Sequence, residues 1–219
     1  MNYRLGSRGE TIKQIQKALC GAGHHVGVID GIFGVMTDEA VRNFQKEHGL
    51  TVDGIVGPAT LAKLVPHRWK KSARSIDKII VHCSATPEGE DRTVEQIRRE
   101  HKAQGWSDIG YHYVVYRDGS IHVGRDVDIQ GAHCADNGGN IGSIGVCYIG
   151  GVEARRPGVA YKDLKAKDTR TEEQKAALLS LLLDLHVKYP KAVICGHRDL
   201  DRHGKACPSF DAKKEYKRV

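Results

Sequence analysis

The stretch Lys78-Ile79-Ile80-Val81-His82-Cys83-Ser84 decides the fold of the larger part of this chain. Its short apolar run, Ile79–His82, predicts a buried strand. Polar and reactive residues follow the run at once. Loops that a rigid sheet holds at the ends of strands are where α/β proteins commonly carry functional side chains. The stretch therefore predicts a central strand with a candidate site residue, His82, at its end.

Helices and strands alternate after this strand. Thr93-Val94-Glu95-Gln96 is a capping box that predicts the start of a helix, and Arg117-Asp118-Gly119 predicts the turn of a hairpin. Thr171 caps a second helix, which we expect to end near Pro190. The other expected strands are Tyr113–Tyr116, Ser120–Val123, Ser143–Ile149 and Ala192–Cys195, and the inward leucines of the second helix are Leu178, Leu181, Leu182 and Leu185. With residues 152–170 as an irregular surface insertion, the pattern predicts an α/β (α+β) fold, a mixed central sheet covered by helices.

Residues 1–66 predict a separate small domain of three helices. The signals are Ile12, Ile15, Ala18 and Leu19 at helical spacing, the N-cap Thr37 and the end Gly49 of a second helix, and Pro58 in the first turn of a third. Asp-Gly-x-x-Gly occurs at Asp30–Gly34 and Asp53–Gly57, a weak internal repeat of 23 residues whose composition suits tight turns. Residues 67–75 are expected to form a basic linker, and residues 76–219 the second domain.

The composition bounds the class of protein. The chain has 219 residues, of which 40% are hydrophobic and 28% charged, as in an ordinary soluble protein. Its apolar runs are shorter than the roughly 18 residues that a membrane-spanning helix needs, and Met1–Gly6 has no apolar core of a signal peptide. We therefore expect synthesis in a cytoplasm and no membrane insertion. There the six cysteines would stay reduced, with Cys147 and Cys195 as small buried hydrophobic residues.

The net charge of +7 is spread along the chain. Residues 1–70 carry nine basic and six acidic side chains, an excess of three, and the rest carry 25 and 21, an excess of four. A nucleic-acid-binding protein more often concentrates its basic residues on one element, so no nucleic-acid partner is expected. Diffuse positive charge favours loose attraction to a polyanionic surface such as a bacterial envelope, or serves solubility alone.

His82, His197 and Cys207 form the candidate site. Both histidines follow apolar strands, and the three residues are 115 and 10 positions apart, which is not a zinc-finger spacing. Two imidazoles and one thiolate suit zinc, and three protein ligands leave one tetrahedral position for water. Strand alternation points Cys83 away from His82 and makes it an unsuitable fourth ligand. If the three residues meet in space, the chain is a hydrolase with a catalytic zinc ion.

Four segments of residues 5–64 form a recognisable pattern. They are Leu5-Gly6-Ser7-Arg8-Gly9, Ile15-Gln16-x2-Leu19, Val28-x-Asp30-Gly31-x2-Gly34-x2-Thr37-x2-Ala40-Val41-x2-Phe44-Gln45 and Val52-Asp53-Gly54-x2-Gly57-Pro58-x-Thr60. This pattern resembles the small peptidoglycan-binding domain found at the ends of many wall hydrolases. The resemblance implies a non-catalytic module that holds an enzyme on the bacterial wall.

Seven segments of residues 76–213 form a second pattern. They are Val81-His82-Cys83-Ser84-Ala85-Thr86, Gly105-Trp106-x-Asp108-Ile109-Gly110-Tyr111-His112-Tyr113, Arg117-Asp118-Gly119, Gly124-Arg125, Gly131-Ala132-His133, Ser143-Ile144-Gly145-Val146-Cys147 and Lys205-Ala206-Cys207-Pro208-Ser209-Phe210-Asp211. The pattern resembles the zinc N-acetylmuramoyl-L-alanine amidases, which include short phage amidases and the peptidoglycan recognition proteins. The resemblance implies one zinc ion per chain, held by His82, His197 and Cys207, with Tyr111 and Lys205 assisting catalysis.

The chemistry suggests a role for each helper. Zinc lowers the pKa of bound water toward about 7 and makes hydroxide available for attack on the carbonyl that joins N-acetylmuramic acid to L-alanine. The Lys205 ammonium would stabilise the oxyanion. The Tyr111 hydroxyl, with an ordinary pKa of about 10, is a better orienting group than base. His133 resembles a position that lines the substrate groove and is expected to contact substrate.

Three neighbouring residues carry secondary expectations. His112 is expected to have a structural role, because strand alternation turns it away from Tyr111. Asp199 is a candidate to orient a ligand imidazole. The loop Asp199–Gly204 is longer than in the short phage amidases and introduces His203 as a competing candidate ligand. We expect Cys207 to be the ligand, because its Lys-x-Cys-Pro context matches the family pattern.

Together these features predict a phage endolysin that cleaves peptidoglycan between N-acetylmuramic acid and L-alanine and so lyses bacteria. We expect a monomer, made in the host cytoplasm and released to the wall with the help of a holin. One alternative is a peptidoglycan-binding recognition protein that does not cleave, as in family members that lack the cysteine ligand. Another is an added role as inhibitor of a phage RNA polymerase.

Overall fold

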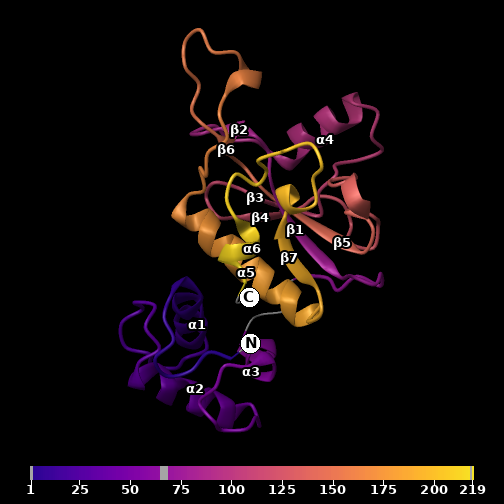
Figure 1. Cartoon of the computed structure of the whole chain (residues 1–219). Coiled ribbons are helices and arrows are strands. Elements are labelled where there is room, and N and C mark those ends of the chain that lie inside the picture. Colours follow the sequence, from indigo (N-terminus) through magenta and orange to yellow (C-terminus); the bar gives the residue numbers. More distant parts are fainter. Residues whose placement is uncertain (1, 65–68, 218) are drawn as a thin grey trace. The chain divides into compact units, whose positions relative to one another are not determined.

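The computed structural model describes residues 2–64, 69–217 and 219 (Figure 1). Contacts divide the chain into two compact units. The first contains the chain up to Trp69 together with Leu179–Lys188 and the C-terminal residue, and the second contains Lys70–Leu178 and Tyr189–Lys217. The expected end of the first domain at residue 66, and residues 67 and 68 of the expected linker, lie outside the described residues.

The first unit contains the three helices that the sequence predicts, α1 (Glu10–Gly21), α2 (Val35–Glu47) and α3 (Pro58–Leu64). The expected N-cap at Thr37 is wrong. The helix begins at Val35, and its N-cap is Gly34, three residues before Thr37. Thr37 lies buried in the first turn, where its hydroxyl accepts a hydrogen bond from Gln16 (3.3 Å). The helix ends as expected just before Gly49, whose φ of 64° suits a residue without a Cβ.

One buried glutamine holds each copy of the Asp-Gly-x-x-Gly motif. Gln16 Nε2 donates to the Asp30 carboxylate (3.1 Å), and Gln16 Oε1 accepts from the Gly31 N–H (2.9 Å). Gln45 makes the same two contacts with the aspartate and first glycine of the second copy, at 2.8 and 3.0 Å. Each glutamine also donates to a threonine hydroxyl in the helix that follows its motif. The weak sequence repeat is therefore a repeated hydrogen-bonded structure.

A five-stranded sheet, in the order β4-β3-β5-β1-β7, forms the centre of the second unit. Its strands are β1 (Lys78–Cys83), β3 (Tyr113–Val115), β4 (Ile121–Val123), β5 (Ser143–Tyr148) and β7 (Val193–Gly196). β1 pairs in parallel with β5 and β7, β5 in parallel with β3, and β3 antiparallel with β4. The predicted mixed sheet and its hairpin are confirmed. A separate small sheet pairs β2 (Thr86–Pro87) with β6 (Gly151–Val152).

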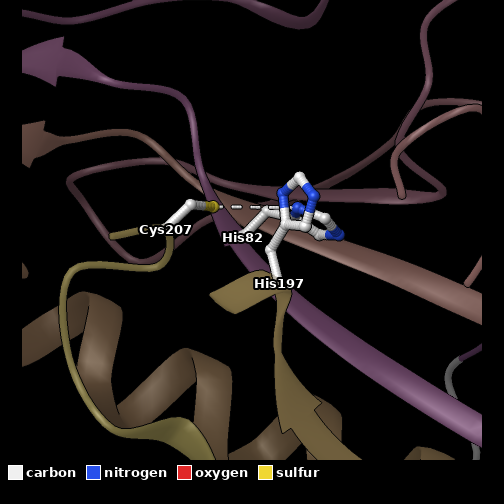
Figure 2. Close-up of side chains that lie close together, drawn as sticks. All are labelled: His82, His197 and Cys207. Atoms are coloured by element: carbon white, nitrogen blue, oxygen red, sulfur yellow. Dashed lines mark hydrogen bonds between the residues drawn. The ribbon is translucent and has the colours of Figure 1, made fainter. Parts of the chain in front are cut away.

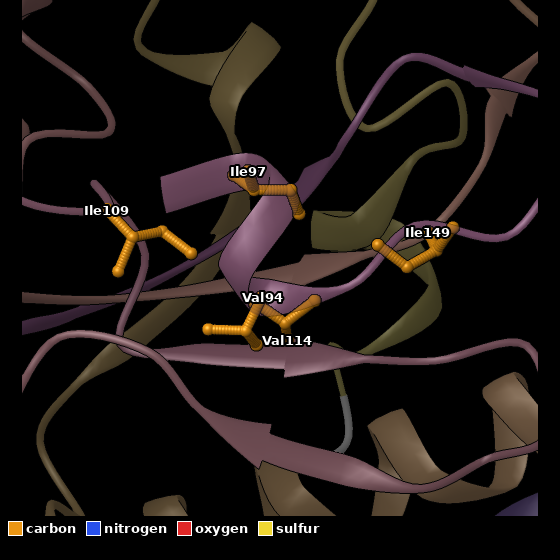
Figure 3. Close-up of a cluster of buried hydrophobic side chains, with 5 residues drawn as sticks. All are labelled: Val94, Ile97, Ile109, Val114 and Ile149. Atoms are coloured by element: carbon orange, nitrogen blue, oxygen red, sulfur yellow. The ribbon is translucent and has the colours of Figure 1, made fainter. Parts of the chain in front are cut away.

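Helix α4 (Val94–Ala103) packs against this sheet. Its predicted capping box is present, with the Thr93 and Gln96 side chains each accepting the other residue's backbone N–H. Val94 and Ile97 belong to a buried cluster with Val114 of β3 (Figure 3). Ile109 and Ile149 complete the cluster. The apolar face predicted for this helix therefore becomes part of the core.

Helix α5 (Glu172–Lys188) also begins as predicted. Thr171 and Gln174 exchange two hydrogen bonds between side chain and backbone, both 3.1 Å long. The Gln174 amide donates further to the carbonyls of Val115 (3.2 Å) and Ile149 (2.9 Å), which ties the first turn of the helix to the sheet. The predicted inward residues Leu178, Leu181, Leu182 and Leu185 are all buried.

The rest of the second unit is mostly irregular. Residues 152–170 form the expected insertion, with β6 at its start and a short 3-10 helix, η2 (Tyr161–Asp163), within it. The last helix is α6 (Ala212–Glu215). Within residues 2–64, 69–217 and 219, no helix combines the length and the apolar character that crossing a bilayer requires.

Replacing either Gln16 or Gln45 by alanine is expected to destabilise the first unit by about 1–3 kcal/mol, because the buried N–H of the motif's first glycine loses its acceptor. In the full chain, hydrogen exchange should accelerate at the Gly31 amide in Gln16→Ala and at the Gly54 amide in Gln45→Ala. Gln14→Ala is the control, since its amide bonds Glu10 on the exposed surface. Unchanged exchange in the first two variants would contradict the role given to these glutamines.

Candidate metal centre

His82, His197 and Cys207 converge at one edge of the sheet (Figure 2). Val81 of β1 pairs with Gly196 of β7, so each histidine stands one residue beyond this pair. The two strands are parallel, and their carboxyl ends therefore bring both imidazoles to the same edge. The candidate ligand atoms of the three residues lie within 4.8 Å of one another, and His82 Nδ1 is 3.8 Å from Cys207 Sγ.

Burial keeps both imidazoles neutral. It lowers the pKa of His82 far below the ordinary value, and the neighbouring His133 and His197 lower it further. Burial also lowers the pKa of His197, whose Nε2 is buried without a hydrogen-bond partner among the described residues. Neutral imidazole is the form that binds metals. Two such nitrogens and a sulfur fit a borderline-soft divalent cation such as zinc.

The backbone of Cys83 holds the sulfur of Cys207. The Cys83 N–H donates to Cys207 Sγ (3.3 Å), while the Cys83 thiol contacts Ser209 Oγ at 3.7 Å. Hydrogen bonding to Cys83, together with burial, raises the pKa of Cys207. A bound cation would offset this rise by stabilising the thiolate. The cluster of candidate ligands does not include Cys83, in keeping with the direction expected from strand alternation.

His133 lies behind His82. Its Nδ1 is 3.0 Å from His82 Nε2, and its own Nε2 is 3.3 Å from Ser143 Oγ. The sequence predicts that His133 lines the substrate groove, but its side chain is buried and directed at a candidate ligand. Because His82 Nε2 is engaged in this way, His82 Nδ1 is left to face Cys207.

Two glycines make room for the His133 ring. A Cβ added at Gly131 would lie 2.5 Å from His133 Cδ2, and one added at Gly145 would lie 2.4 Å from the same atom. Such approaches are far inside van der Waals contact. The glycines of Gly131-Ala132-His133 and Ser143-Ile144-Gly145 are therefore required by packing around this imidazole.

His112 has the structural role that the sequence predicts. Its Nδ1 accepts the Gly145 N–H (2.9 Å), which leaves Nε2 to donate to the Ile129 carbonyl (3.1 Å). Burial lowers the pKa of His112 to about 4. The neutral ring joins the strand that carries Gly145 to the loop before His133.

Tyr111 lies beside the cluster. Its ring centroid is 5.2 Å from that of His82 and 5.5 Å from that of His101. Burial raises the pKa of Tyr111 well above the ordinary value, and the neighbouring Cys147 thiol adds to the rise. The Tyr111 phenol therefore stays protonated and can donate a hydrogen bond, but it cannot serve as a base at neutral pH.

Cys147 and Cys195 are both buried, as expected.

Lys205 lies at the rim of the cluster. Its side chain is 52% exposed, and Nζ is 3.6 Å from Asp201 Oδ1. Its charge contributes to the lowered pKa of both His82 and His197. Two candidate ligands therefore experience the positive charge of Lys205. A group that stabilises an oxyanion at the metal would also be placed at this position.

The structure bears on two expectations about the segment from η3 (His197–Asp199) to Cys207. Asp199 accepts the Gly196 N–H (2.8 Å), so its carboxylate holds the end of β7. Carboxylate oxygens of Asp136 and Asp201, two residues that no sequence pattern indicated, lie within 4.8 Å of a His197 ring nitrogen. His203 is 72% exposed and lies 3.6 Å from Asp136, and the residue that joins His82 and His197 in the cluster is Cys207, the one expected from the sequence.

Arg170 fixes the segment that follows Cys207. Its guanidinium carbon lies 3.3 Å from the centroid of the Phe210 ring, and it bonds the carboxylates of Asp168 and Glu215. The Arg170 side chain is only 2% exposed. A charge this deeply buried is stable because it is paired and hydrogen-bonded. Sequence reasoning missed Arg170, since no local pattern shows which distant residues an arginine will join.

Comparisons with known proteins agree with this geometry. Residues 72–210 match the N-acetylmuramoyl-L-alanine amidase family, and residues 8–64 match the family of peptidoglycan binding domains. The chain is similar to the endolysin of Klebsiella phage KP32, with 44% identity over 138 residues, 63% of this chain and 83% of that one. It is 42% identical to the endolysin of Escherichia phage T7 over 144 residues, 66% of this chain and 87% of that one.

The similarity extends to a solved structure. The endolysin N-acetylmuramoyl-L-alanine amidase LysCS of Clostridium intestinale URNW superposes with a TM-score of 0.51 at 25% identity. The match covers 65% of this chain and 81% of that one. The mixed sheet with its surrounding helices is therefore similar to the fold of this solved amidase structure.

Arg170→Met is expected to lower the free energy of unfolding by about 2 kcal/mol, because it leaves two carboxylates without their bidentate partner. This loss of unfolding free energy is smaller than is usual when a buried ion pair loses one partner, because Asp168 and Glu215 are partly exposed and water can solvate them. Urea unfolding of the full chain measures it. Arg156→Met is the control, because this exposed arginine pairs with Glu153 on the surface and should change stability by less than about 0.5 kcal/mol. Equal effects of the two substitutions would contradict the role of Arg170.

Proposed function

Because the chain belongs to the N-acetylmuramoyl-L-alanine amidase family over residues 72–210, we propose that it uses one bound zinc ion to hydrolyse peptidoglycan. The chain is a peptidoglycan amidase with a lytic function, like the phage endolysins it resembles. The bond cleaved joins N-acetylmuramic acid to the L-alanine of the stem peptide. The observation that supports zinc is the convergence of His82, His197 and Cys207, two neutral imidazoles and one thiol, within 4.8 Å.

In this proposal His82 Nδ1, a ring nitrogen of His197 and Cys207 Sγ hold the ion. Zinc bound there would act as a Lewis acid and lower the pKa of a water molecule toward about 7. The fully buried His82 and the nearly buried His197 keep bulk water away from one side of the site. Cys207 is only half-buried.

Tyr111 and Lys205 act on the reacting amide. The protonated Tyr111 hydroxyl donates a hydrogen bond that orients the attacking water or the substrate carbonyl. The Lys205 ammonium stabilises the negative charge that develops on the carbonyl oxygen. This division follows from their environments, because Tyr111 is partly buried next to His82 while Lys205 is half-exposed at the rim.

The two parts of the chain have separate tasks in the proposal. Residues 1–66 hold the enzyme on peptidoglycan, residues 67–75 link them to the enzyme, and residues 76–219 catalyse. The match of residues 8–64 to peptidoglycan binding domains supports the first task. Similarity to phage endolysins supports action on the cell wall after release. We propose that the protein is made in a host cytoplasm and reaches the wall with the help of a holin. We propose that the enzyme acts as a monomer.

Removing the metal should abolish activity. The purified protein is expected to contain about one zinc per chain and to release intact stem peptides with new L-alanine amino groups from isolated walls. A chelator should stop the reaction, and zinc should restore it. His82→Ala should lose both the bound zinc and at least about a thousandfold of the rate, an order of magnitude typical for loss of an essential group.

His122→Ala is the matched control, because this histidine stacks on Tyr116 away from the cluster. It should keep wild-type zinc content and rate. Full activity of the metal-free protein, or new reducing ends in place of amino groups, would contradict the proposal. Wall binding without any cleavage would favour a recognition protein.

His133→Asn tests whether this residue orients His82 or contacts substrate. If it orients His82, zinc affinity should fall by about 10- to 100-fold, as is common when a residue behind a metal ligand is replaced. Competition with a chromogenic chelator measures this affinity. Ser143→Ala, which removes the far end of the same contact chain, should have a smaller effect in the same direction. Unchanged zinc affinity with a raised KM would instead support the substrate contact expected from the sequence.

A further inference from the structure

Asp201 is a buried carboxylate on an otherwise exposed loop. Its side chain is 1% exposed, whereas the side chains of His203 and Lys205 on the same loop are 72% and 52% exposed. Burial of a carboxylate is costly unless it is paired and hydrogen-bonded. The loop nevertheless turns this side chain inward, toward the candidate metal centre.

The two oxygens of Asp201 have different surroundings. Oδ2 accepts the backbone N–H groups of His203 (2.7 Å) and Lys205 (2.8 Å), so it fixes the path of the loop. Oδ1 is buried and accepts no hydrogen bond within the described part of the chain, although the Lys205 ammonium lies 3.6 Å away. A carboxylate oxygen of Asp201 also lies within 4.8 Å of a His197 ring nitrogen. One carboxylate therefore stands between the ammonium and a candidate zinc ligand.

The charges around His197 oppose each other. The Lys205 ammonium lies 3.6 Å from Asp201 Oδ1, and carboxylate oxygens of Asp201 and Asp136 lie within 4.8 Å of a His197 ring nitrogen. An ammonium beside a metal site disfavours a bound cation, and a carboxylate next to both groups offsets that repulsion. A carboxylate beside a ligand imidazole also orients the ring and strengthens it as a donor.

We propose that Asp201 is a positioning residue that holds the Lys205 ammonium at the reacting carbonyl and orients His197 toward the metal. The inference rests on the proposed zinc mechanism. Asp201 does not touch substrate in this role and acts through Lys205 and His197. The same position also explains why Asp201 is buried while its neighbours on the loop face solvent.

Asp136, His197 and Asp201 could alternatively hold a second cation, since one ligand atom of each lies within 4.8 Å of the others. We favour the positioning role because the Lys205 ammonium already lies next to Asp201 and supplies the positive charge. If one ring nitrogen of His197 binds zinc, moreover, Asp136 and Asp201 can both face only the other side of that ring. The number of zinc ions bound per chain separates the two roles.

The test compares Asp201→Asn, Lys205→Met and the double variant in the full-length protein. The asparagine side chain of the first variant retains an oxygen for the backbone N–H groups but removes the charge. Asp201→Asn is expected to lower kcat about 10- to 100-fold with KM nearly unchanged, and to weaken zinc binding about tenfold. In the Lys205→Met background the same substitution should lower kcat by no more than about twofold, since its action through Lys205 is already lost. The loss of zinc affinity should persist there.

His203→Ala is the matched control, from the same loop but with an exposed ring, and should keep the wild-type kcat and zinc affinity. The melting temperature of each zinc-free variant separates a folding defect from a site defect. If Asp201→Asn does not fold, Asp201→Glu keeps the charge and moves the carboxylate by one methylene. It should then keep most of the zinc affinity while lowering kcat.

Three results would overturn the inference. The first is a wild-type kcat and zinc affinity in Asp201→Asn. The second is a loss of kcat in the double variant equal to the product of the losses in Asp201→Asn and Lys205→Met. The third is two zinc ions per wild-type chain. These results differ from failure of the zinc mechanism itself. In that case the chelator and Lys205→Met would leave wild-type activity intact, whatever Asp201→Asn does.

Discussion

The parallel pairing of β1 with β7 is the constraint on which the site depends. Because Val81 pairs with Gly196, the next residues of the two strands, His82 and His197, reach one edge of the sheet together. A shift of one residue in this register would turn one imidazole to the opposite face. Cys207 needs only a ten-residue return from His197 to meet them. The sheet thus places His82 and His197, and the loop after His197 brings Cys207 to them.

Burial gives this geometry its chemistry. An imidazole removed from water keeps its lone pair at neutral pH, and both histidines are buried enough for that. The second ring nitrogen of His82 is then occupied by His133, for which Gly131 and Gly145 leave space. The same packing that stabilises the fold therefore decides which nitrogen faces the ligand cluster.

Local sequence signals predicted most of the fold. Capping boxes, turn residues and apolar spacing act over a few residues, so the helices, the hairpin and the strands of the mixed sheet were predictable. The start of α2 was not, because Thr37 looks like a cap by itself but is bonded by Gln16 across 21 positions of sequence. The structural repeat built by Gln16 and Gln45 depends on the same kind of distant contact.

The sequence by itself determined the elements, the family resemblance and the candidate ligands His82, His197 and Cys207. These depend on residue type and local order. Only the tertiary structure decided that His133 lies behind a ligand and that Asp201 approaches His197. The direction in which a loop turns its side chains depends on backbone hydrogen bonds and packing between segments far apart in the chain, and the spacing of residues along the sequence does not encode that direction.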